Sequence, residues 1–317
     1  MKRSAPIREL LQARADLFDE VRRFFRARGV LEVDTPLLSA AAGTDPALEP
    51  FVTRHCGAEG DRARYLQTSP EFHMKRLLAE GSGDIFQIAH AFRQGELGRR
   101  HNPEFILLEW YRIGYDHHRL MVEVAELVNR LLDRKLPVEK ITYRSLFQRR
   151  FGWDPLETAA AEMARTAAKE GIAMGGSLDR DQWLDLLMGA VVQRELGRGA
   201  LTFVHDYPAS QASLARLHPQ DFRLASRFEL YLEGVELANG FHELTDAAEQ
   251  LARFEADNRK RRQRGQQPLP VDRRLIEALE RGLPDCSGVA LGLDRLLMLK
   301  LEAGALAEVL TFPYAVA

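Results

Sequence analysis

Two glutamates in a predicted β-hairpin are the first residues in this sequence whose spacing could do chemistry. The stretch "RFELYLEGVELANGF" holds two β-rich runs around residues 233–234, which is typical of a two-residue turn. With that turn, Tyr231 faces Glu236. Glu229 then faces Ala238, and the two glutamates are diagonal neighbours with Cβ atoms about 7–8 Å apart. Mg²⁺ prefers carboxylate oxygens, so the pair is a candidate metal site. Two solvent-facing glutamates are the alternative.

A loop rich in arginine and glycine is the second candidate. "FRQGELGRRHNPEF" lies between two strand-like runs. Arginine forks suit phosphate oxygens, and glycines let the backbone approach a ligand closely. Phe105, at the start of the second run, could stack on a purine. A solvated hairpin tip and an ordinary core phenylalanine are the alternatives.

A glycine-spaced run near the C-terminus is the third candidate. "SGVALGLDR" places Gly288, Gly292 and Arg295 near the start of a predicted helix. It allows either close approach to a ligand or tight packing. Further acidic or phenolic groups lie near these elements and would together suit an ammonium substrate, although for any one of them taken singly a surface residue is the favoured interpretation. They are Glu71, Glu109, Tyr111 and Glu243.

The elements that must position these residues follow an α+β pattern, with an antiparallel β-sheet flanked by helices. A helix is expected over 7–28, ended by Gly29, and a strand follows until Pro36. Ser69 is the expected N-cap of a helix with Pro70 in its first turn. Strands are expected over 85–93, 104–115 and 200–208, and helices over 118–134, 156–171, 179–197 and 246–265.

The composition excludes several classes of protein. The chain has 317 residues, is 45% hydrophobic and carries a net charge of −2, so it can bury a large core and has no general affinity for nucleic acid. Cys56 and Cys286 form no metal-binding spacing and are expected to be structural. The sequence has no long apolar run, which predicts a cytoplasmic protein without a membrane segment. The basic run "NRKRRQRG" is either a solvated helix end or a surface for an acidic partner.

Taken together, these motifs resemble class II aminoacyl-tRNA synthetases over about residues 7–312. "GVLEVDTPLL" resembles motif 1, at the dimer interface of that family, while "FRQGELGRRHNPEF" and "GVALGLDRLLML" resemble motifs 2 and 3. "TSPEFHMKRLL", "RHNPEFILLEWY" and "ELANGFHEL" are similar to the lysyl branch. The resemblance implies one catalytic domain over 1–317, with a helical insertion at about 118–198 between motifs 2 and 3.

Motif 1 begins by residue 29, so we expect no N-terminal OB-fold domain. The compact form resembles the paralogue family that ligates (R)-β-lysine to elongation factor P. "PASQASLA", "GFHELTDA" and "PDCSGVALGLDRL" carry that likeness. It implies ATP and Mg²⁺ as cofactors, elongation factor P as acceptor, a homodimer, and no charging of tRNA. A truncated lysyl-tRNA synthetase-like enzyme and a catalytically silent paralogue are the alternatives.

The resemblance also implies roles for individual residues. Arg93 and Arg295 are the expected catalytic residues. Binding of ATP is expected from Arg93, Gln94, Gly95, Glu96, His101, Asn102, Phe105, Glu236, Leu237, Gly292 and Arg295. Binding of the amino acid is expected from Ser69, Pro70, Glu71, Glu109, Tyr111, Asn239, Glu243 and Ala290, with Gly240 lining the site. The metal is expected at Glu229 and Glu236.

Two positions depart from the lysyl pattern. Motif 2 reads "FRQGE" where lysyl synthetases have "FRNEG", so the acidic residue on the adenine side is Glu96, displaced by one place, or backbone takes its part. Ala290 stands where lysyl synthetases usually have glycine. Its methyl group would crowd an α-amino group, which favours β-lysine over α-lysine.

Overall fold

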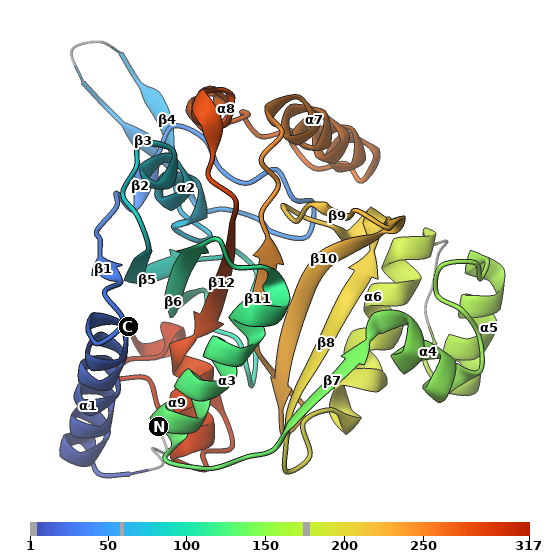
Figure 1. Ribbon diagram of the computed structural model, residues 1–317, viewed down its shortest axis with the longest axis horizontal. Helices are drawn as coiled ribbons and strands as arrows, with labels where there is room; N and C mark the ends of the chain where they lie inside the picture. Colours follow the sequence, from blue (N-terminus) through green and yellow to red (C-terminus); the bar gives the residue numbers. More distant parts are fainter. Residues whose placement is uncertain (1–4, 58–59, 174–177) are drawn as a thin grey trace. The chain divides into compact units, whose positions relative to one another are not determined.

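The computed structural model describes residues 5–57, 60–173 and 178–317. The chain divides into two compact units, and each combines strands with flanking helices (Figure 1). Unit 1 consists of Met1–Tyr115 with Thr245–Ala317, and unit 2 consists of Asp116–Leu244. The strand pairing within each unit is mostly antiparallel, which confirms the predicted α+β class. Among the described residues, no helix has the length and apolar character needed to cross a membrane.

Unit 1 contains a sheet in the order β1–β5–β6–β12, in which only β1 and β5 are parallel. Its strands are β1 (Leu31–Glu32), β5 (Ile85–Phe92), β6 (Glu104–Ile113) and β12 (Cys286–Gly292). A smaller sheet contains β2 (Leu38–Ser39), β3 (Val52–His55) and β4 (Arg62–Leu66). The helices are α1 (Ile7–Arg26), α2 (Glu71–Ala79), α7 (Ala247–Gln263), α8 (Arg273–Gly282), α9 (Leu293–Lys300), η3 (Leu306–Glu308) and η4 (Tyr314–Val316).

The first helix holds the sheet of unit 1 by its aromatic face. Phe25 stacks on Phe86 of β5 with ring centroids 4.6 Å apart and meets Trp110 of β6 edge-on at 5.3 Å. All three side chains are buried, so the contact contributes both apolar area and aromatic geometry. Gly29 follows α1 with a φ of +69°, which glycine adopts without a steric cost. The predicted strand after it is confirmed, but it is only two residues long.

The start of α2 differs slightly from expectation. Pro70 is the N-cap residue, and the hydroxyl oxygen of Ser69 accepts from the backbone N–H of Glu71 at 3.3 Å. Ser69 therefore still satisfies a donor at the helix start, but it lies one residue before the N-cap, so the predicted cap position is wrong by one residue.

Unit 2 contains a sheet in the order β11–β10–β8–β7, with β9 paired to β10. Its strands are β7 (Val138–Thr142), β8 (Leu201–Pro208), β9 (Leu217–His218), β10 (Asp221–Leu232) and β11 (Val235–His242). The helices are α3 (His117–Leu132), α4 (Tyr143–Phe151), α5 (Ala160–Lys169), α6 (Arg180–Ala190), η1 (Val192–Glu195) and η2 (Ala209–Gln211). Helix α4 was not predicted. Its Phe147 is fully buried in a core shared with α5 and α6.

The hairpin of β10 and β11 confirms the predicted turn but not the whole register. Glu233 and Gly234 both have positive φ, at 50° and 69°, as a type I′ turn requires. Tyr231 pairs with Glu236 as expected. A β-bulge then shifts the register, so Glu229 pairs with Asn239, and its expected pairing with Ala238 is wrong. The extra residue lies on β11. Because of it, Glu236 and Asn239, three residues apart, both lie on the face of the hairpin that carries Tyr231 and Glu229.

Candidate functional site

Arg93, directly after β5, lies against the start of β6. Its guanidinium carbon is 5.0 Å from the ring centroid of Phe105, and its Nη1 is 3.6 Å from a carboxylate oxygen of Glu96. Its Nε donates to the carbonyl of Thr68 at 3.4 Å, and its backbone N–H donates to Pro103 at 2.9 Å. The structure therefore brings together the arginine, the aromatic ring and the displaced acidic residue that the sequence singled out.

Arg295 on α9 reaches the same loop from a distant part of the sequence. Its Nε donates to the carbonyl of Arg100 at 3.2 Å. Burial, then the charge of Arg295, lowers the pKa of His101, while Glu96 opposes the shift. A Cβ atom added at Gly292 would lie 3.7 Å from Cδ of Arg295, in ordinary contact. The second and third candidate motifs thus form one cationic surface that could bind a polyphosphate.

Asn102 holds the loop rather than facing solvent. Its Nδ2 donates to the carbonyl of Glu104 at 2.6 Å, and its Oδ1 accepts from the backbone N–H of Tyr314 at 3.1 Å. The loop tip is more open, since Gln94 and Gly95 are exposed. Gly95 has a φ of +84°, a conformation that favours glycine.

Glu109 and Tyr111 form a buried pair on β6. The hydroxyl of Tyr111 donates to Oε1 of Glu109 at 2.7 Å, and each residue is 2% exposed. On the neighbouring strand β12, Ala290 is the register partner of Glu109 and Gly288 is the partner of Tyr111. A buried carboxylate needs a cation or several donors, so this pair is a natural partner for an ammonium group.

Glu71, in the first turn of α2, already has a cationic partner. The Nζ of Lys75 lies 2.7 Å from its Oε1, and that lysine is only 2% exposed. Ser69 and Pro70 precede it at the helix start. Since the lysine belongs to the same helix, part of the charge of Glu71 is already balanced without any substrate.

In unit 2, Glu229 is 8% exposed, and three side chains hydrogen-bond to its carboxylate. Its Oε2 accepts from the hydroxyl of Tyr207 at 2.6 Å and from that of Tyr231, and its Oε1 is bound by Arg227. Burial, together with the charge of Glu229, holds the pKa of both tyrosines well above the usual value. They therefore remain hydrogen-bond donors to the carboxylate.

Glu236 and Asn239 lie opposite Tyr231 and Glu229 on the same face of the hairpin. Two carboxylates and an amide oxygen are ligands of the kind that Mg²⁺ prefers, so the donor set fits this ion. Arg227 donates to Oδ1 of Asn239 at 3.2 Å as well as binding Glu229. Arg227 and Tyr207 were missed by the sequence analysis, although the arginine stands two residues before Glu229, where a strand places it on the same face.

The remaining predicted residues of unit 2 lie on or just after β11. Leu237 and Gly240 are buried, and Leu237 is the extra residue of the bulge. Glu243 is 1% exposed, and its backbone carbonyl accepts from Nε of Arg216 at 3.0 Å.

Asp294 links the second and third candidate motifs, and the sequence did not single it out. Its Oδ1 lies 2.6 Å from a guanidinium nitrogen of Arg14, and its Oδ2 accepts from the backbone N–H of Ile106 at 2.7 Å. It fixes the residue after Phe105 relative to the helix that carries Arg295. The signal was present in the sequence, as a single acid inside the apolar run "LGLDRLLML".

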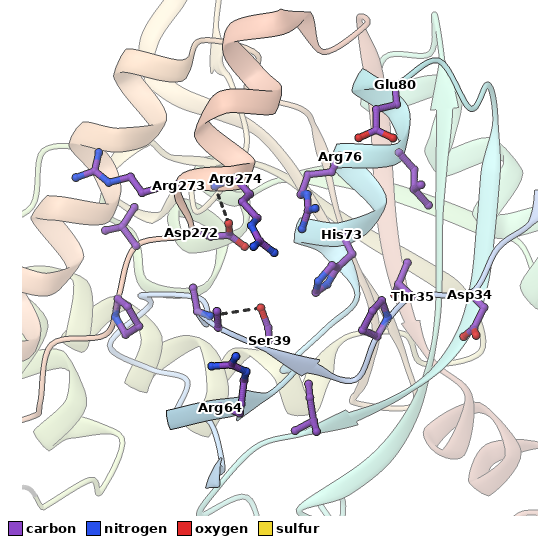
Figure 2. A pocket seen from close by; sticks show the side chains of 17 residues that line it. Asp34, Thr35, Ser39, Arg64, His73, Arg76, Glu80, Asp272, Arg273 and Arg274 are labelled. Atoms are coloured by element: carbon purple, nitrogen blue, oxygen red, sulfur yellow. Dashed lines mark hydrogen bonds between the residues drawn. The ribbon is translucent and has the colours of Figure 1, made fainter. Parts of the chain in front are cut away.

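Unit 1 also has a cavity of about 580 Å³ that none of the predicted site residues lines (Figure 2). Four arginines surround it, together with His73, whose pKa is lowered by burial and by Arg76. The arginines are Arg64, Arg76, Arg273 and Arg274. Asp272 faces the same space, but its carboxylate also accepts from the first N–H groups of α8.

The predicted basic surface of α7 needs a correction. Arg261 is 0% exposed, and its Nη2 lies 2.6 Å from a carboxylate oxygen of Glu49. Its Nε also donates to the carbonyl of Gln267 at 2.8 Å. This arginine is structural, whereas Arg259 and Arg262 are exposed.

Residues 1–316 match the family described as tRNA synthetases class II (D, K and N). The chain is 52% identical over 314 residues to an elongation factor P–(R)-β-lysine ligase of Yersinia enterocolitica, covering 98% of this chain and 96% of that protein. It is 51% identical over 313 residues to the proteins of that name from Klebsiella pneumoniae and Salmonella paratyphi A, with the same coverage.

Proposed function

The chain belongs to the class II tRNA synthetases (D, K and N), and we propose that it activates (R)-β-lysine with ATP and transfers it to a lysine of elongation factor P. The relatives' names support the substrates, and their similarity extends over nearly the whole chain. One observation supports the proposal most strongly. Arg93 lies beside the ring of Phe105, and Arg295 binds the backbone of the loop between these two residues. We also infer that the protein is soluble and cytoplasmic, which agrees with a protein acceptor that takes part in translation.

The reaction has two steps. A carboxylate oxygen of β-lysine attacks the α-phosphorus of ATP, the bond to the bridging oxygen breaks, and pyrophosphate leaves. Arg93 stabilises the negative charge that develops on the α-phosphate, and Arg295 stabilises the departing phosphates. The acceptor amine then attacks the carbonyl carbon of the acyl-adenylate. AMP leaves, and the amine loses its proton to solvent.

Recognition of the adenine rests on Phe105, with Arg93 beside its ring. Gln94, Gly95, Glu96, His101, Asn102 and Gly292 complete the nucleotide site. Recognition of the amino acid rests on the buried carboxylate of Glu109, oriented by the hydroxyl of Tyr111. Glu71, Asn239 and Glu243 add polar groups for the ammonium ions, and Ala290 limits the space.

Mg²⁺ would be held by Glu229 and Glu236 and would supply positive charge to the phosphates. The residues of the chain supply the rest. Tyr207, Tyr231 and Arg227 hold the Glu229 carboxylate in one orientation, so little reorganisation is needed when substrate arrives.

A homodimer through motif 1 is part of the proposal. Leu31, Leu37 and Leu38 of that motif are 58%, 39% and 49% exposed, which is unusual for three leucines within eight residues. Sedimentation of the wild type should give the mass of two chains, and Leu38→Glu should shift it toward one. A wild type that sediments as one chain at micromolar concentration would remove this part.

The central experiment supplies ATP, Mg²⁺ and either α-lysine or (R)-β-lysine, with elongation factor P or tRNA as acceptor. Intact mass spectrometry should find one β-lysyl group added to the protein acceptor and no charged tRNA. Charged tRNA with unmodified protein would indicate a minimal synthetase instead. Absence of pyrophosphate exchange with both amino acids would indicate a silent paralogue. Arg93→Ala is the matched inactive control.

A further inference from the structure

Three histidines and an aspartate gather inside unit 2, and none of them is among the residues assigned above. His117 and His118 begin α3, while His205 and Asp206 lie near the end of β8. One donor atom from each of the four lies within 4.8 Å of the others. The two pairs are about ninety residues apart in the sequence, so only the fold brings them together.

The contacts within the group are specific. Nε2 of His117 is 3.3 Å from Oδ1 of Asp206, and Nδ1 of His205 is 2.9 Å from Oδ2 of the same carboxylate. The ring of His118 lies 4.1 Å from that of His117 and 5.2 Å from that of His205, measured between centroids. Asp206 therefore orients two of the imidazoles through one nitrogen each and leaves each ring its second nitrogen.

A second observation points to a ligand. Nδ1 of His117 is buried and has no hydrogen-bond partner, and this side chain is only 4% exposed. A buried ring nitrogen without a partner is destabilising unless an ion or water occupies its lone pair. The Nε2 atom of the same ring faces Asp206, which is the arrangement by which a carboxylate orients a metal-binding histidine.

We propose that the imidazoles of His117, His118 and His205, oriented by Asp206, form a binding site for a divalent transition-metal ion of the zinc class. Imidazole nitrogen is a preferred ligand for zinc and its neighbours, whereas Mg²⁺ prefers oxygen. With bonds of about 2.0–2.1 Å, donors around a tetrahedral ion lie roughly 3.3 Å apart. The gathered side chains need only a modest closure to reach this spacing. His118 is exposed and can rotate, and it also provides the path for the ion.

The charges in the group agree with metal binding. Burial, then the neighbouring His117 and His205, lowers the pKa of His118 to about 4. Its ring is therefore neutral near pH 7, which is the ligating form. Burial would raise the pKa of Asp206, but hydrogen bonds from the two histidines outweigh it and hold that pKa well below the usual value. A negative carboxylate close to the neutral ring of His118 attracts a divalent cation.

The metal would tie the first turn of α3 to the end of β8. Tyr207, the residue after Asp206, is the donor to Glu229 described above. The expected role of this ion is structural, because none of its ligands belongs to the carboxylate pair Glu229 and Glu236 of the hairpin.

The test uses the full chain, stripped of metal with a chelator and then titrated with Co²⁺. We expect visible absorption of tetrahedral Co²⁺ to saturate at about one equivalent per chain, Zn²⁺ to abolish it, and excess Mg²⁺ to leave it unchanged. His118→Gln and His205→Gln should weaken binding at least about tenfold, since loss of outer groups alone costs 10–100-fold. His218→Gln, on β9 of the same unit, is the control and should bind as the wild type.

A thermal melt separates binding from folding. Zn²⁺ should raise the Tm of the wild type and of His218→Gln, but not that of His118→Gln, whose exposed side chain can be replaced without disturbing the core. The proposal is overturned if the wild type shows neither saturable Co²⁺ absorption nor a Tm increase. It is also overturned if the His118 and His205 variants bind Co²⁺ as tightly as the control.

Discussion

Ala290 on β12 is the direct register partner of Glu109 on β6. The residue expected to select between amino acids thus lies on the strand beside the carboxylate expected to bind the ammonium group. Cβ atoms of such partners are about 4.5–5.5 Å apart, so one methyl group changes the space beside the carboxylate directly.

Ala290→Gly should therefore reduce the preference for (R)-β-lysine over α-lysine. A single methyl group in a binding pocket is worth about 1–3 kcal/mol, or roughly 10–200-fold in specificity. Pyrophosphate exchange with each amino acid gives the ratio of kcat/KM values. Ala290→Ser keeps a side chain at this position and should retain most of the preference. An unchanged ratio in the glycine variant would remove Ala290 from the selectivity argument.

The ion pair between the half-buried Arg14 and the buried Asp294 should couple strongly in stability. Breaking a buried ion pair typically costs about 3–5 kcal/mol, and Asp294 also accepts from the N–H of Ile106. Asp294→Asn should therefore destabilise more than Arg14→Ala. Urea unfolding of both single variants and the double variant gives the coupling energy. A coupling near zero would show that the aspartate acts through Ile106 alone.

Asp257 on α7 should make the protein less stable as pH rises. Burial, then the nearby Asp45, raises its pKa from the usual 3.8 to about 6, while the hydroxyl of Thr44 opposes the shift. The folded state thus binds the proton more tightly than the unfolded state. Its contribution is fully present below about pH 4 and is lost as pH rises through about 6.

Asp257→Asn should consequently gain stability relative to the wild type above pH 6, by about 2 kcal/mol, and little at pH 4. Urea unfolding at both pH values measures the difference. An equal effect of the substitution at the two pH values would contradict the raised pKa.

The exposed arginines of α7 remain a candidate docking surface for elongation factor P. Arg262→Glu should raise the KM for the protein acceptor and leave pyrophosphate exchange unchanged. Charges at the rim of an interface mainly affect how fast the two proteins associate, and they do not act on the adenylation step. Arg261→Ala should instead lower the Tm, since it removes the partner of Glu49. If the KM is unaffected by Arg262→Glu and Arg259→Glu, another surface binds the acceptor.

The sequence predicted the elements well where local chemistry decides them. The turn at Glu233-Gly234 and the ends of α1 followed from residue type. The bulge after Glu236 did not, because Leu237 continues a β-rich run and nothing local marks it as extra. Burial of Arg261 was equally hidden, since its partners come from residues 45–49.

The candidate site was predicted residue by residue only because several motifs agreed with one family. The pair of Glu71 and Lys75 could have been read from their helical spacing of four. The group around Asp206 could not, since only the packing of α3 against the sheet unites its members.

The bulge on β11 has one more consequence. Removing Leu237 would leave Tyr231 paired with Glu236 and Glu229 paired with Asn239, because it is the one residue in this part of the ladder without a partner. What would change is the local twist of the strand, which a bulge increases. Leu237 therefore affects the direction in which the Glu236 carboxylate points. The hydrogen-bonding ladder determines which residue lies opposite Glu236.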